Sequence, residues 1–298
     1  MKRFVRYQNG NYTVTIDTQN GTKIRENDLD FFRADFPESM DIKICNKCDL
    51  GCPQCHENST PDGKCGDIMS ESFIDKLHPY TELAIGGGNP LEHPSLVPFL
   101  EKCQRLNLIP SMTVNQIHFE KHKGFLKALV DKKLIYGLGI SLVNGDEEFV
   151  AQVKEFPNAV IHVINGMSAD PNELERLAHQ NFKILILGYK EFRRGVDHYN
   201  VASERIEKKK RNLYDMLPNI IDENWFDVVS FDNLAIKQLD AQRLMSAEDW
   251  EQFYMGDDGS ATMYVDMVNR EFAKSSTSTE RYPLEDDIVT MFEKIRTN

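Results

Sequence analysis

The sequence lacks any apolar run close to the roughly 20 residues that a membrane-spanning helix needs. Its basic first residues, Met1 to Tyr7, lack the apolar core of an export signal. It also lacks an excess of positive charge, since 47 acidic residues outnumber 35 basic ones and the net charge is -12. Such a balance disfavours non-specific binding to nucleic acid or to anionic membranes. We therefore expect a cytoplasmic protein without a membrane partner.

Cysteine is scarce and unevenly placed. None of the six cysteines follows Cys103, and four of them lie between Cys45 and Cys55. A disulfide framework spreads its cysteines across the fold, so this cluster indicates a metal site instead. Because only Cys65 and Cys103 remain outside it, the thiolates that auxiliary iron–sulfur clusters would need are missing.

The N-terminal part of the chain predicts a small β appendage, over residues 1–38. Asn9-Gly10 and Asn20-Gly21 are dipeptides typical of tight hairpin turns, and β-forming residues alternate between them. We expect hairpins over residues 1–24.

From about residue 40, apolar strands alternate six times with helical segments, which predicts an α/β fold with a parallel sheet over residues 39–226. The apolar runs indicate strands buried on both faces. Periodicity alone is compatible with a barrel, a partial barrel or an open sheet. The predicted strands are residues 41–45, 83–85, 112–114, 138–142, 160–164 and 184–187, and the predicted helices are residues 70–77, 94–106, 119–131, 147–155, 172–179 and 204–216.

Residues 227–298 predict an α+β extension, with a strand over 228–236, a helix over 247–253 and a hairpin over about 262–275. The N- and C-terminal hairpins have too few strands to be stable alone. We expect them to join in one small β unit that, with the loop 255–259, covers part of the barrel mouth.

The cysteine cluster allows three interpretations. Structural zinc sites usually have two ligand pairs a dozen or more residues apart, whereas only three residues separate Cys48 from Cys52. A ferredoxin-type run ends in Cys-x3-Cys-Pro, which Cys48 to Pro53 matches, but no second run completes it. In the third interpretation, Cys48, Cys52 and Cys55 are three ligands of a cluster whose fourth iron stays open.

Cys48-x3-Cys52-x2-Cys55 after a first strand resembles the signature of the radical S-adenosylmethionine superfamily. The resemblance implies a [4Fe-4S] cluster on these three cysteines, with S-adenosylmethionine on the open iron. The position of Cys45 is often Thr in the family, which makes Cys45 a strand-end residue and not a ligand. Gln54 stands where the family usually has an aromatic residue.

A second motif, Gly86-Gly87-Gly88-Asn89-Pro90, resembles the family's Gly-Gly-Glu-Pro motif, with Asn89 in place of Glu. Glycines let backbone carbonyls approach an ammonium group closely. The resemblance therefore implies that this turn holds the methionine amino group.

Other cofactor contacts follow from the resemblance, which covers roughly residues 40–190. It implies that Ser141 and Asn144 meet the ribose or carboxylate, and that Asn165 and Gly188 approach the adenine. It also favours a partial (β/α)6 TIM-like barrel with small N- and C-terminal hairpin appendages.

The implied activity is reductive cleavage of S-adenosylmethionine to a 5′-deoxyadenosyl radical that abstracts hydrogen from a substrate. The implied partners are a small-molecule or peptide substrate and an electron donor such as flavodoxin or ferredoxin. The alternative is an iron–sulfur electron-transfer or zinc-binding α/β protein, which would not need the glycine turn. Candidate substrate contacts are His56, Glu57, Asn58, Asn115, Gln116, His162, Lys190 and Arg193.

Overall fold

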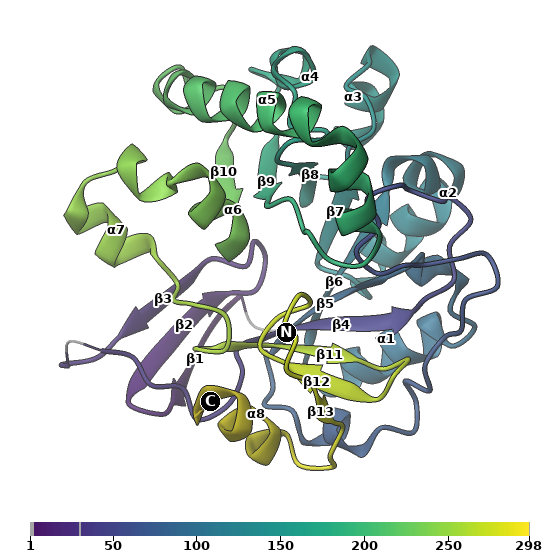
Figure 1. Ribbon diagram of the computed structural model, residues 1–298. Helices are drawn as coiled ribbons and strands as arrows, with labels where there is room; N and C mark the ends of the chain where they lie inside the picture. The colour runs from purple at the N-terminus through teal and green to yellow at the C-terminus, as the bar shows by residue number, and fades with distance from the viewer. Residues whose placement is uncertain (1–2, 30, 298) are drawn as a thin grey trace.

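A computed structural model describes residues 3–29 and 31–297 of the chain and shows two β-sheets (Figure 1). The main sheet has the strand order β10-β9-β8-β7-β6-β5-β4-β11-β12-β13. Its strands from β10 to β11 are parallel, and β12 and β13 are antiparallel. The strands are β4 (Ser39–Cys45), β5 (Glu82–Gly87), β6 (Ile109–Asn115), β7 (Gly137–Ser141), β8 (Ala159–Ile164), β9 (Lys183–Leu187), β10 (Val228–Phe231), β11 (Thr262–Asp266), β12 (Glu271–Ala273) and β13 (Tyr282–Pro283).

The predicted α/β fold and its six parallel strands are confirmed, and β10 and β11 extend the parallel part. The edge strands β10 and β13 are not paired with each other in the described part of the chain, so the barrel stays open. The strand predicted over residues 228–236 is too long. It ends at Phe231, because the Asp232 side chain caps helix α6 (Asn233–Leu239) by accepting the Ala235 N–H.

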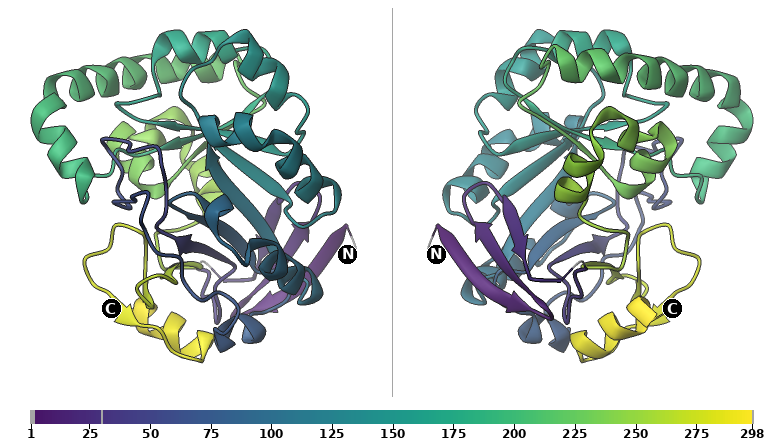
Figure 2. Two further views of the ribbon diagram at one scale, coloured as in Figure 1. Left: turned by 90° about the vertical axis from the view of Figure 1, so that its right-hand side faces the viewer. Right: turned by 90° about the vertical axis from the view of Figure 1, so that its left-hand side faces the viewer.

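Helices cover one face of the sheet, which becomes the outside of the barrel (Figures 1 and 2). The segment predicted as a helix over 70–77 is the 3-10 helix η1 (Ser72–Lys76). The long helix α5 has a non-helical residue at Ala202 and exceeds its predicted length. The outer helices are α1 (Leu96–Arg105), α2 (Gln116–Asp131), α3 (Glu147–Val153), α4 (Pro171–Leu177) and α5 (Arg194–Asp222).

The two faces of the barrel sheet differ in burial. In β5, β6, β8 and β9, buried residues alternate with half-exposed ones. The buried set, such as Ile85, Met112 and Ile161, packs in the hydrophobic core under the helices. The other set lines the inside and includes small or polar residues such as Gly86 and Thr113, so the inner face stays open to solvent.

The N-terminal segment forms its own antiparallel sheet of β1 (Phe4–Asn9), β2 (Tyr12–Asp17) and β3 (Lys23–Glu26). The predicted turns are confirmed, with Gly10 and Gly21 at positive φ; residues 1 and 2 of the predicted hairpin lie outside the described residues. This sheet attaches at the amino ends of the barrel strands, where Lys23 Nζ lies 2.5 Å from the Glu82 carboxylate. Glu82 is the first residue of β5.

The prediction that the two terminal hairpins join in one β unit over the barrel mouth is wrong. β1 to β3 lie at the amino end of the barrel, opposite the cysteine cluster, whereas β11 and β12 continue the main sheet beside β4. Each hairpin finds its pairing partner separately, because an exposed strand edge at β4 accepts β11. Beyond α6, the C-terminal part contains η3 (Ala241–Leu244), α7 (Ala247–Phe253) and α8 (Ile288–Thr297).

None of the helices formed by the described residues combines the length and the apolar composition that crossing a membrane requires.

Candidate active site at the carboxyl ends of the barrel strands

The predicted cluster cysteines lie in the long loop that follows β4. Cys48, Cys52 and Cys55 are free thiols of intermediate burial. The Cys48 N–H donates to the Thr60 carbonyl over 2.9 Å, which folds the loop back on itself. Cys45, the last residue of β4, forms a disulfide with Cys65 and closes the base of this loop.

The three thiols lie close enough to influence one another. Burial raises the pKa of the Cys52 thiol, and the neighbouring Cys55 and Cys48 raise it further. Burial is also the main reason that the pKa of Cys48 is raised, and Cys55 adds to it. One loop therefore presents three free sulfur atoms to a common site.

His118 joins this loop from α2, and sequence reasoning missed it. Its Nε2 lies 2.7 Å from Asp49 Oδ1, and its ring is buried. The ligand atoms of Cys48, Asp49 and His118 all lie within 4.8 Å of one another. The pairing joins residues 69 positions apart, so no local spacing in the sequence could have indicated it.

The glycine turn packs directly against the cysteine loop. The Gly88 N–H donates to the Cys45 carbonyl and the Asn89 N–H to the Lys47 carbonyl, each over 2.7 Å. Gly87 has φ of +121°, and a Cβ there would lie 2.3 Å from the Cys45 carbonyl oxygen. A Cβ on Gly86, in contrast, would meet nothing within 4 Å, so Gly86 borders open space on the inner face.

Asn89 and Pro90 shape this turn. The Asn89 side chain is 1% exposed, and its Oδ1 accepts the Leu91 N–H over 3.2 Å. It thereby caps the 3-10 helix η2 (Pro90–Glu92), in which Pro90 occupies the first position. The side-chain oxygen of Asn89, the residue in place of the motif's Glu, is thus already engaged in a local cap.

The other predicted cofactor contacts fall into two groups. Ser141 ends β7 on the inner face, and Asn144 follows it in a loop that Gln116 organises. Gln116 Oε1 accepts the Asn144 N–H over 3.0 Å, and its Nε2 lies 3.3 Å from Asn144 Oδ1. Asn115, another candidate, caps α2 by accepting the Ile117 N–H.

Asn165 and Gly188 belong to a different corner, at the ends of β8 and β9. Asn165 Nδ2 donates to Gln238 Oε1 of α6 over 3.1 Å, while the buried Asn165 Oδ1 has no hydrogen-bond partner. A Cβ on Gly188 would lie 2.4 Å from the Leu234 side chain, so α6 covers Gly188. Gln238 also accepts the Tyr189 N–H, which ties both strand ends to α6.

Glu57 anchors the end of the cysteine loop to the barrel. Its carboxylate lies 2.9 Å from Lys43 Nζ, 3.3 Å from His56 Nε2 and 3.4 Å from Arg193 Nη1. Burial alone favours the neutral acid, but the His56 hydrogen bond and the Lys43 ammonium hold the pKa of Glu57 well below its usual range. Lys43 also pairs with Asp266 of β11, so this network joins the loop to β4 and β11.

Charged side chains also line the barrel interior. Asp41, Lys190 and His162 come from β4, the end of β9 and β8, yet Lys190 acts electrostatically on both of the others. Burial, helped by Lys190, lowers the pKa of His162 to about 4, so this imidazole is neutral at pH 7. Asp41 and Lys43 are charged residues inside a short strand, a signal in the sequence that predicts an inward-facing polar site.

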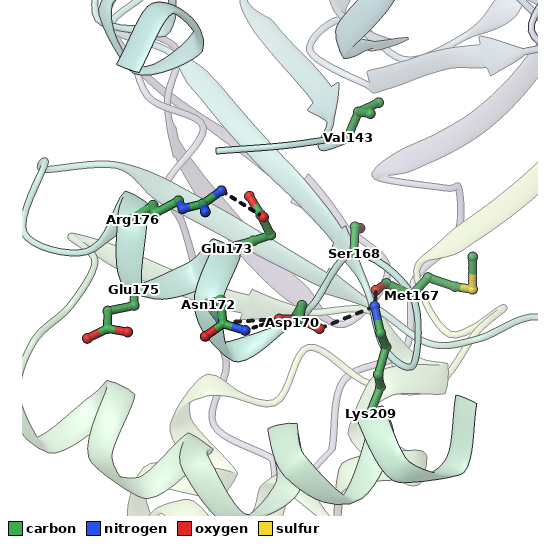
Figure 3. A pocket seen from close by; sticks show the side chains of 9 residues that line it. All are labelled: Val143, Met167, Ser168, Asp170, Asn172, Glu173, Glu175, Arg176 and Lys209. Atoms are coloured by element: carbon green, nitrogen blue, oxygen red, sulfur yellow. Dashed lines mark hydrogen bonds and ion pairs between the residues drawn. The ribbon is translucent and has the colours of Figure 1, made fainter. Parts of the chain in front are cut away.

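A hollow of about 630 Å³ lies outside this constellation, between the loops after β7 and β8 and the helices α4 and α5 (Figure 3). Both of its cations are paired with acids, Lys209 with Asp170 and Arg176 with Glu173. No predicted site residue lines it.

The comparisons with known proteins show the fold. No model of a known protein family matches the chain. The structure of Streptococcus suis SuiB bound to the precursor peptide SuiA is similar with a TM-score of 0.66 at 13% identity, covering 99% of this chain and 90% of SuiB. SuiB bound to S-adenosylmethionine gives a TM-score of 0.64 at 12% identity, covering 100% of this chain and 90% of SuiB.

In sequence, the chain is similar to the PqqA peptide cyclase of Gluconobacter oxydans (strain 621H), with 24% identity over 92 residues. The match covers 29% of this chain and 26% of that protein. The structural likeness to SuiB reaches beyond residues 40–190 and includes both ends of the chain.

Proposed function

We propose that this chain, which has the fold and the cysteine spacing of the radical S-adenosylmethionine superfamily, is an enzyme of that superfamily that acts on a peptide. Cys48, Cys52 and Cys55 would hold a [4Fe-4S] cluster. Gly86 to Gly88 would receive the amino group of S-adenosylmethionine.

One observation carries the proposal: the glycine turn, about 30 residues further along the sequence, donates hydrogen bonds to Cys45 and Lys47 at the start of the loop that carries the three free cysteines. The residues fit both groups. A cubane [4Fe-4S] cluster binds each thiolate at a different iron, and the loop offers three free thiols for three of its irons. The open space beside Gly86 and the unpartnered Oδ1 of Asn165 leave room and an acceptor for a ligand.

Bound there, the cluster and S-adenosylmethionine would supply a 5′-deoxyadenosyl radical that abstracts hydrogen from a substrate carbon, after one electron from a donor such as flavodoxin or ferredoxin. The residues of the chain would bind the cofactor and the substrate and orient them relative to each other. The Cys45–Cys65 disulfide and the Glu57 network hold the cysteine loop, and the open inner face receives the substrate.

The peptide assignment is supported by the relatives. SuiB binds a precursor peptide, and the sequence match is to a peptide cyclase. The barrel remains open between β10 and β13 in the described part of the chain, which suits a chain-like substrate better than full enclosure would.

The test is anaerobic purification followed by iron and sulfide analysis. The protein is then treated with a reductant in the presence of S-adenosylmethionine. We expect about four irons and four sulfides per chain, a brown colour and formation of 5′-deoxyadenosine. A colourless protein that forms no 5′-deoxyadenosine after cluster reconstitution would refute the proposal.

A second candidate function is a mononuclear metal site, favoured by the close approach of Cys48, Asp49 and His118. These three side chains offer sulfur, oxygen and nitrogen ligands of the kinds that zinc accepts. His118→Ala separates the two functions. It would remove a mononuclear ion, whereas the proposed cluster would keep its three cysteine ligands.

A further inference from the structure

We propose that Lys190, Arg281 and the Ser276 hydroxyl form a subsite for an oxyanion of the substrate, a carboxylate or a phosphate, beside the cysteine loop. This inference rests on the proposed function, because it names a chemical group of the substrate that the barrel would take. It goes beyond the cofactor contacts, since none of the three residues belongs to a predicted cofactor site.

Lys190 supplies the first charge. Its Nζ donates to Ser276 Oγ over 2.9 Å and lies 3.4 Å from His56 Nε2. Neither partner is an anion, and within the described residues no carboxylate oxygen lies within 4.0 Å of this ammonium. The Lys190 charge is therefore held in place without a contacting counter-ion.

Arg281 supplies the second charge. Its Nε and Nη2 donate to the backbone carbonyls of Ser278 and Ser276, which fixes the guanidinium. It lies 4.9 Å over the Tyr264 ring. Its Nη1 is buried and has no hydrogen-bond partner, and no ion pair to Arg281 occurs among the residues that the structure describes. A buried N–H donor without a partner is costly, and an oxyanion would satisfy it.

The loop that carries these groups reaches across the barrel opening. Residues 274–281 connect β12 with β13, yet Ser276 contacts Lys190 at the far side, after β9. Five strands of the sheet lie between β9 and β11, so this contact bridges the mouth. His56, directly after Cys55, contacts Lys190 and places the subsite next to the cysteine loop.

Two of the neighbouring acids, Glu57 and Asp266, are already neutralised. Glu57 is paired with Lys43, His56 and Arg193. Asp266 is paired with Lys43 and accepts the Val268 and Asn269 N–H groups. Asp41 is the exception, but it makes no ion pair with Lys190 in the described structure and interacts with it only from a distance. The cations at the subsite therefore keep the field that attracts an anion.

The experiment measures saturable binding of small probes to the anaerobically reconstituted full chain at low ionic strength by calorimetry. Acetate and inorganic phosphate are the probes, and choline is the cationic control. Wild-type protein should bind one of the anions at one site and not choline. Lys190→Met and Arg281→Met should each weaken this binding about tenfold or more, as loss of a charge-assisted hydrogen bond does.

Lys237→Met is the matched control, because Lys237 is an exposed lysine beside Asp257. This variant should bind the anion probes as wild type does. Lys190→Arg and Arg281→Lys keep the charges and should retain most of the binding, even where a methionine variant folds poorly. Acetate binding at least as tight as phosphate assigns a peptide carboxylate, and tighter phosphate assigns a phosphorylated substrate.

The subsite is refuted by two results: no saturable anion binding to wild type, or equal binding to wild type and both methionine variants. Formation of 5′-deoxyadenosine, measured on the same wild-type sample, reports on the proposed function separately. Anion binding without 5′-deoxyadenosine would contradict the radical chemistry and keep the subsite.

Discussion

The two ends of strand β4 are each held by a buried glutamate, and the difference between them separates stability from function. At the amino end, Glu38 is 1% exposed and accepts the Tyr12 hydroxyl, with Arg25 Nε at 3.0 Å and Lys23 Nζ at 3.6 Å. Every partner belongs to the N-terminal sheet. This network joins the N-terminal sheet to the amino end of β4, and its charges are paired.

At the carboxyl end, Glu57 is also buried and also surrounded by cations and a tyrosine, Tyr264, whose hydroxyl lies 3.4 Å away. Around it, however, stand three free thiols, an open glycine and two cations without contacting counter-ions among the described residues. A buried glutamate with cationic partners therefore stabilises both ends. Only at the carboxyl end, where α/β barrels carry their active sites, does the described structure place free thiols and cations without contacting counter-ions around it.

The largest expected effect comes from the carboxyl end. Replacing Cys48, Cys52 or Cys55 with Ala should abolish cluster binding and 5′-deoxyadenosine formation, because three thiolates are the minimum anchoring. Iron analysis and absorbance spectra measure this. Cys103→Ala, a buried thiol of α1 outside the loop, should keep the iron, as should Cys45→Ala and Cys65→Ala. Iron retained in Cys55→Ala but lost in Cys45→Ala would reverse the ligand assignment.

The glycine turn gives the next largest effect, at Gly86. Gly86→Val should keep the cluster but weaken S-adenosylmethionine binding at least tenfold, since its side chain would occupy the open space on the inner face. Calorimetry measures the binding. Gly87→Val is a poorer test than the sequence alone indicates, because its Cβ would strike the Cys45 carbonyl and disturb the loop.

Gly124→Ala, where a Cβ also meets nothing within 4 Å, is the matched control in α2 and should bind S-adenosylmethionine as wild type does. Unchanged binding in Gly86→Val would remove the turn from the cofactor site.

The two glutamates test the comparison itself. Glu38→Gln should lower the free energy of unfolding by about 3 kcal/mol, because it leaves buried cations without their acid, and should not change the iron content. Glu57→Gln should cost a similar amount and also lower the iron content, since Glu57 anchors the cysteine loop. Urea unfolding and iron analysis measure both.

Glu26→Gln is the control for charge removal, because its ion pair with Arg6 is exposed on both sides and contributes little. Equal iron loss in Glu38→Gln and Glu57→Gln would show that the two ends do not differ as described.

The smallest effect concerns His162 in the barrel interior. Its pKa is lowered to about 4 by burial and by Lys190, below the unfolded value near 6.5, so the unfolded chain binds the extra proton first. Stability should therefore fall as the pH drops from about 6.5 to about 4. His162→Gln should lose less stability than wild type between pH 7 and pH 5, measured as the urea midpoint. An equal loss in both proteins would mean that His162 is solvated.

Much of the fold could be predicted because it depends on local pattern. The six strands, the helices that follow most of them and the Asn-Gly turns are confirmed at nearly the predicted positions. The misplaced features depend on partners far along the chain. The strand that begins at residue 228 is shorter than predicted, because Asp232 caps helix α6 and so ends the strand. The predicted joining of the terminal hairpins is wrong, because the sequence pattern does not specify which distant sheet edge a strand pairs with.

The candidate site divides in the same way. The cysteine spacing and the glycine turn indicate a cofactor from residues that are neighbours in sequence. Spacing could not assign the roles of Lys43, Asp266 and His118, since their partners lie between 14 and 223 positions away in the sequence. Nor could it assign Arg281, whose Nη1 has no hydrogen-bond partner among the described residues.

By itself, the sequence predicted the barrel strands, the resemblance to the radical S-adenosylmethionine superfamily and the three proposed ligands, because each depends on short-range periodicity or on a compact motif. Only the tertiary structure decided which charges are neutralised. Glu57 is saturated while Lys190 and Arg281 are not, and Gly86 faces open space while Gly87 touches the backbone. The physical reason is that electrostatic pairing and free volume depend on through-space distance, which the order of residues along the chain does not specify.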